Sequence, residues 1–158
     1  MAVWQVDFYL VPQRALATAP RPLAPATMDD TAWWASTPFP ADYRVRLGAV
    51  APVRRSRSED LETWGDEEGN RVDVWSDGGR VRNVMVRVDV RRLDPRFGAA
   101  LLVFVRAANG ALVRRDGLVV EPTINAYSGA LRSSSAWRYV SDPIAWLAAQ
   151  VASNEDAE

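Results

Sequence analysis

Residues 71 to 92 read RVDVWSDGGRVRNVMVRVDVRR, and this stretch decides the fold class. Asp77-Gly78-Gly79 interrupts two runs in which valine recurs at every second position. Glycine adopts the positive φ angles that a tight hairpin turn requires. The pattern therefore predicts two antiparallel strands joined by a short turn.

The second of these strands has two chemically different faces. Valines at 84, 86, 88 and 90 share one face, while the other face carries Met85, Arg87, Asp89 and Arg91. Such alternation is typical of an antiparallel sheet with one buried side and one side that is wet or only partly covered.

The same kind of analysis extends to the rest of the chain. Residues 61–64 predict a strand before the acidic turn at 65–70, and Asp116-Gly117 predicts a second hairpin between ALVRR and DGLVVEP. Alternation predicts further strands at 4–10 and 43–51. Capping residues and prolines predict helices over 29–36, 95–109, 124–133 and from 143 through 151.

These elements predict an α+β fold. We expect a mostly antiparallel five- or six-stranded sheet with about three to four helices packed mainly on one face. The chain length of 158 residues fits a single domain over 1–152, followed by a frayed acidic tail over 153–158.

Three missing residue types restrict the chemistry. The chain has no histidine, no cysteine and no lysine, because all 19 basic residues are arginine. This excludes a Ser-His-Asp triad, thiolate nucleophiles, Schiff-base lysines and imidazole or thiolate metal sites. We expect no cofactor, no metal site and no catalytic residues, and the composition suggests a cytoplasmic bacterial protein.

Charge and hydropathy restrict the partners. The net charge is -1 and the arginines are scattered among acidic residues, so we expect no nucleic acid partner. The most apolar stretch, 99–105, is far shorter than the ~20 residues that span a bilayer, so we expect no membrane partner. We expect the partner to be another protein, and a homo-oligomer of this chain is the alternative.

The polar face of the predicted hairpin is the first candidate site. Trp75 shares a face with Arg71 and Asp73, next to the polar face of the following strand. Aromatic and arginine side chains are enriched at protein interfaces, although a cross-strand ladder would use the same residues. The candidate interaction surface consists of Trp64, Asp66, Glu67, Glu68, Trp75, Arg87, Asp89 and Arg91.

The adjacent indoles Trp33 and Trp34 form a second candidate site, together with Tyr43. Neighbours on a helix point about 100° apart, so one indole could close the core while the other faces outward. If exposed, these rings form a platform for a small ligand or a carbohydrate.

Carboxylates are the only acid-base groups that remain. Asp73, Glu121 or Asp116 could in principle serve a hydrolase, but their spacing gives this little support. Ser133-Ser134-Ser135 lacks a histidine or lysine base. The sequence therefore favours a non-catalytic protein-interaction domain, either immunity-like or an adaptor, over a ligand binder, with a carboxylate-dependent hydrolase third.

Overall fold

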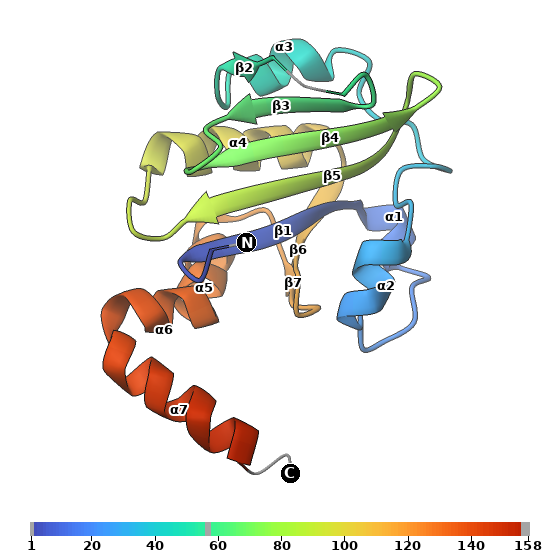
Figure 1. The fold of residues 1–158 in the computed structure, drawn as a ribbon. Coiled ribbons are helices and arrows are strands. Elements are labelled where there is room, and N and C mark those ends of the chain that lie inside the picture. The colour runs from blue at the N-terminus through green and yellow to red at the C-terminus, as the bar shows by residue number, and fades with distance from the viewer. Residues whose placement is uncertain (1, 56–57, 156–158) are drawn as a thin grey trace.

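The computed structural model describes residues 2–55 and 58–155. Within these ranges the chain forms one antiparallel sheet of seven strands in the order β2-β3-β4-β5-β1-β6-β7 (Figure 1). The strands are β1 (Gln5–Pro12), β2 (Val53–Arg54), β3 (Leu61–Gly65), β4 (Arg71–Asp77), β5 (Arg80–Asp89), β6 (Gly110–Arg114) and β7 (Val119–Val120). The two edge strands, β2 and β7, have only two residues each.

The predicted hairpin is confirmed. β4 and β5 are joined at Gly78 and Gly79, whose φ angles are 56° and 79°. Val72 lies opposite Val86 in the register, so the alternating valines of both strands face the same side of the sheet. Those valines are buried, while Trp75 and Arg87 on the other side are half-buried.

β1 differs from its prediction. The alternation at 4–10 predicts a half-buried strand, but all eight residues of β1 are buried. The reason is its position, because β1 pairs with β5 on one side and β6 on the other. Its polar side chains are covered: Asp7 by Arg87, and Tyr9 by a hydrogen bond to Asp29.

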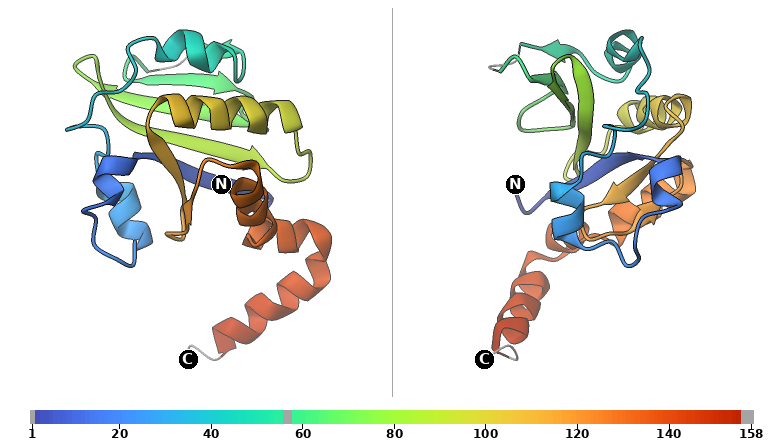
Figure 2. Two further views of the ribbon diagram at one scale, coloured as in Figure 1. Left: turned by 180° about the vertical axis from the view of Figure 1, so that it is seen from behind. Right: turned by 90° about the vertical axis from the view of Figure 1, so that its right-hand side faces the viewer.

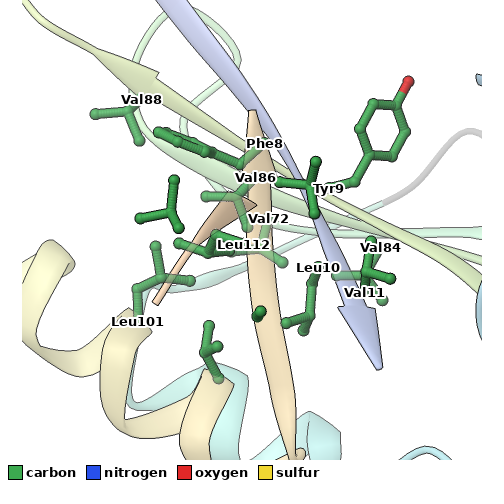
Figure 3. Packing of buried hydrophobic residues seen from close by; sticks show 14 of the residues in the cluster. Phe8, Tyr9, Leu10, Val11, Val72, Val84, Val86, Val88, Leu101 and Leu112 are labelled. Carbon is green, nitrogen blue, oxygen red and sulfur yellow. The ribbon is translucent and has the colours of Figure 1, made fainter. Parts of the chain in front are cut away.

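Helices cover one face of the sheet most completely. The left view of Figure 2 looks at the sheet from behind and shows α4 lying across this face. Tyr127 of α5 contacts Phe8 on the same face. Figure 3 shows Leu101 of α4 pointing toward Leu112 in the core, while Tyr9 lies on the other side of β1. The helices are α1 (Gln13–Leu16), α2 (Pro25–Asp30), α3 (Tyr43–Gly48), α4 (Pro95–Ala107), α5 (Ile124–Arg132), α6 (Ser135–Ser141) and α7 (Pro143–Glu155).

The caps of α4 and α5 confirm two predicted helices. The Asp94 side chain accepts a hydrogen bond from the Arg96 backbone, and the Thr123 side chain accepts one from Ala126. Each cap satisfies a backbone N–H that has no partner within its helix.

The strand expected at 43–51 is wrong. Alternation of Tyr43, Val45 and Leu47 suggested a strand, but Tyr43 and Leu47 are also four residues apart and so share one face of a helix. The structure forms α3, in which both are buried while Val45 is 79% exposed.

Two other boundaries differ from expectation. The helix expected over 29–36 is α2, which begins at Pro25 because proline fits the first turn of a helix. It ends at Asp30, and residues 33–36 form a turn. α7 continues to Glu155, so 153–155, expected in the tail, are helical, while 156–158 lie outside the described residues.

Candidate interaction surface

Part of the sheet carries no helix on one face. In Figure 1 the front of β3, β4 and β5 is uncovered, whereas α4 lies behind these strands. The register places polar side chains of neighbouring strands in rows across this side. We call this the open sheet face, made of Asp7, Thr63, Arg71, Asp73, Trp75 and Arg87.

An ion pair anchors the centre of the open sheet face. The Arg87 guanidinium donates two hydrogen bonds to the Asp7 carboxylate, at 2.8 and 3.1 Å. The Asp7 side chain is fully buried and that of Arg87 is 16% exposed. These hydrogen bonds raise the pKa of Arg87. The arginine therefore neutralises Asp7 and covers it from solvent.

A second buried carboxylate follows on β4. Asp73 accepts a hydrogen bond from the Thr63 hydroxyl at 2.7 Å, and Arg71 Nε lies 2.9 Å from its other oxygen. The Asp73 side chain is 6% exposed. On the open sheet face the two carboxylates thus lie beneath the arginine side chains. The groups that reach solvent are the guanidinium groups and the Trp75 indole.

Trp75 borders a hollow at the β2 side of this face. The hollow has a volume of about 340 Å³ and is lined by Trp75 together with Leu61, Arg54, Arg55 and Arg71, among others. Glu67, from the turn between β3 and β4, reaches the same hollow. This hollow therefore brings together two residues of the predicted interaction surface, Trp75 and Glu67.

Four other predicted residues line a groove at the end of the sheet. Asp66, Glu68, Asp89 and Arg91 border a space of about 1110 Å³ between residues 50–54 and the start of α4. Arg54 borders both this groove and the Trp75 hollow. The groove and the hollow therefore adjoin at Arg54, which lies 3.8 Å from Asp66 and 3.5 Å from Glu67.

Arg91 is fixed from two sides in this groove. Its guanidinium lies 4.2 Å from the centre of the Trp4 ring and donates to Asp89 at 2.6 Å. Burial disfavours the charged form of Asp89, but the hydrogen bonds from the Arg91 side chain and backbone outweigh it. They hold the Asp89 pKa below its usual 3.8.

This depressed pKa predicts acid sensitivity. A carboxyl with a lowered folded-state pKa stabilises the fold above its unfolded pKa, and this contribution is lost as pH falls through the folded value. The urea midpoint of the wild-type protein should therefore drop below about pH 4. Asp89→Asn and Arg91→Leu should each flatten this drop, and an unchanged pH profile in both variants would contradict the assignment.

Trp64 does not belong to the surface. The sequence placed it among the exposed candidates, but it is 2% exposed and packs against Tyr43. Its side chain lies on the valine face of the sheet, since it pairs with Val72. The sequence placed Arg71 on the same face as Trp75, but it gave no sign of Trp4, Arg54 and Arg55, which the fold brings to this region.

The second candidate site lies in the core. Trp33, Trp34 and Tyr43 are 6%, 2% and 6% exposed. The Trp34 Nε1 donates to the Leu10 carbonyl and that of Trp33 to the Met28 carbonyl. Trp33 borders a hollow of about 470 Å³ beside α1 and α2, but the three rings present no shared platform to solvent.

The candidate catalytic carboxylates are not brought together. Asp73 lies on β4, whereas Asp116 follows β6, and β5 and β1 lie between these strands. Strands are spaced about 4.8 Å apart, so this separation is roughly 14 Å, beyond the ~5–9.5 Å of glycosidase pairs. Asp116 is paired with Arg114, and Glu121 is exposed.

Comparisons with known protein families, with curated proteins and with solved structures find no match to this chain. Among the described residues, no group of three or more acidic side chains is placed to hold a metal ion. No helix within 2–55 and 58–155 is both long enough and apolar enough to cross a membrane.

Proposed function

We propose that the protein is a non-catalytic protein-interaction domain that binds its partner on the open sheet face and the adjoining Trp75 hollow. The observation that supports this most is the half-buried Trp75, set among arginines on a face without a helix. Tryptophan and arginine are the residues most enriched at interface hot spots.

The charge arrangement suggests the partner's chemistry. Asp7 and Asp73 are buried, while Arg54 and Arg55 are exposed and Arg71 is partly so. A complementary partner would bring carboxylates to these guanidinium groups and an apolar side chain to the indole. Two narrower roles fit within this proposal. The first is an immunity-like protein that blocks a bacterial toxin, and the second is an adaptor protein.

A pull-down with single variants tests the proposal. Trp75→Ala and Arg55→Ala should lose a protein that the wild type retains from a bacterial lysate, because each removes an accessible side chain that lines the hollow. Loss of a hot-spot side chain typically weakens binding by about 2 kcal/mol or more, which is roughly 30-fold.

Arg132→Ala is the matched control, since it removes an exposed arginine of α5 away from this face. It should retain the partner. The proposal is wrong if the wild type retains nothing, or if the three variants retain the same proteins as the wild type.

A further inference from the structure

The last helix stands away from the rest of the molecule. α7 extends from α6 beyond the sheet and the other helices in all three views (Figures 1 and 2). The Trp146 ring packs edge-on against Tyr139, with centroids 5.2 Å apart, and its Nε1 donates to the Ser135 hydroxyl at 2.8 Å. The Asp142 side chain caps the first turn by accepting from Ala145. The two Trp146 contacts hold the beginning of α7 against α6.

α7 carries an apolar stripe that faces solvent. Ile144, Leu147 and Val151 are 81%, 54% and 58% exposed. Their spacing of three and four residues places them on one side of the helix, and Trp146 lies on the opposite side, toward α6. Between Pro143 and Asn154 no residue is charged. A stripe of this kind is typical of a helix that docks in a groove.

The same chain also has an apolar cleft of about 260 Å³ between α4 and α5. Phe97, Tyr127 and Leu131 are buried around it, while Leu93 and Ile124 on its border are 47% and 55% exposed. Among the described residues that line it, Asp94 is the one with a charge. Docking an uncharged helix there brings no second charge close to Asp94.

We propose that the stripe of α7, formed by Ile144, Leu147 and Val151, docks in the α4–α5 cleft of a second copy of this chain, and that the exchange is reciprocal. A two-fold axis places both helices and both clefts in equivalent contacts, the symmetry of most homodimers. The contacts with α6 hold α7 away from its own body, so the cleft is filled from the other copy.

The buried area supports a reciprocal rather than a single contact. A helix of 13 residues is about 20 Å long and about 10 Å wide, so docking one side of it buries on the order of several hundred Å². One such contact falls short of the ~1,200 Å² that stable interfaces bury, and a reciprocal pair of contacts doubles the buried area. Pairing of α7 with α7 alone would bury only the area of one contact.

The first test measures the mass of the full chain by sedimentation equilibrium over a range of concentrations. The wild type should reach twice the 17.5 kDa of the single chain. Leu147→Asp on the helix and Ile124→Asp on the cleft border should each raise the dissociation constant by on the order of 100-fold, because each change occurs twice in the dimer. Both positions are exposed, so each variant chain should stay folded, with the circular dichroism spectrum of the wild type.

Mixing the two variants gives the decisive result. In a mixed dimer the intact α7 of the Ile124→Asp chain meets the intact cleft of the Leu147→Asp chain, so one of the two contacts is restored. Both aspartates fall in the other contact, which either change alone already breaks. The mixture should therefore associate more tightly than either variant alone. Val103→Asp, at a position of α4 that is 57% exposed, is the control and should remain dimeric.

Three results would overturn the proposal. The wild type could remain a monomer at every concentration. Ile124→Asp could leave a dimer intact, which would point to another interface. The mixture could associate no better than its components, which would point to pairing of α7 with α7.

Discussion

Replacing Trp34 with alanine should lower the free energy of unfolding by about 3 to 5 kcal/mol, the usual cost of removing a buried aromatic side chain. The indole is 2% exposed and contacts the Phe39 ring edge-on at 4.8 Å. Its loss also leaves the carbonyl of Leu10, a fully buried residue, without the indole donor. Urea unfolding followed by circular dichroism measures the change.

Trp75→Ala is the matched control for this prediction. Its indole is half-buried on the open sheet face, so the loss should stay below about 1 kcal/mol. Equal losses in the two variants would show that Trp34 does not close the core.

The second large effect concerns the ion pair between Arg87 and Asp7. Arg87→Leu should destabilise the fold by about 3 to 5 kcal/mol, because it leaves the fully buried Asp7 carboxylate without its bidentate partner. Arg87→Lys should cost less, since it keeps a positive charge but loses the planar two-point contact. Both are measured as shifts of the urea midpoint.

A double variant separates burial of a charge from loss of packing. Asp7→Val combined with Arg87→Leu removes both charges and should recover most of the stability lost in Arg87→Leu. If the double variant were as unstable as the sum of the two single variants, the cost would come from packing and not from an unpaired buried charge.

Local patterns predicted the parts of the fold that depend on neighbouring residues. Two glycines and alternating valines defined the β4–β5 hairpin, and Asp94-Pro95 defined the start of α4. In these segments turn chemistry, capping and burial agree, and such agreement makes a short sequence specify one structure.

Tertiary context decided the parts that the sequence did not predict. Residues 43–48 fit a strand or a helix equally well by pattern, and only the burial of Tyr43 and Leu47 selects the helix. Asp116-Gly117 did predict the hairpin of β6 and β7, whereas the edge strand β2 is too short to show alternation. For the same reason the sheet has seven strands instead of five or six.

The candidate surface was predicted in part. The alternation of β4 and β5 correctly placed Trp75 and Arg87 on the side away from the core, because side-chain direction follows from strand period. The burial of Trp64 could not be read in this way, since a strand of five residues fits either face. Arg54 joins the surface only through the folding of a distant loop.

The shortness of β2 and β7 affects how the protein behaves when it is crowded. An exposed edge strand is a template on which further chains add in register and grow into fibres. Here the edge strands β2 and β7 have only two residues each, a short template for an incoming strand. Concentrated solutions should therefore not polymerise by edge-to-edge strand pairing, and association should proceed through side chains to particles of defined size.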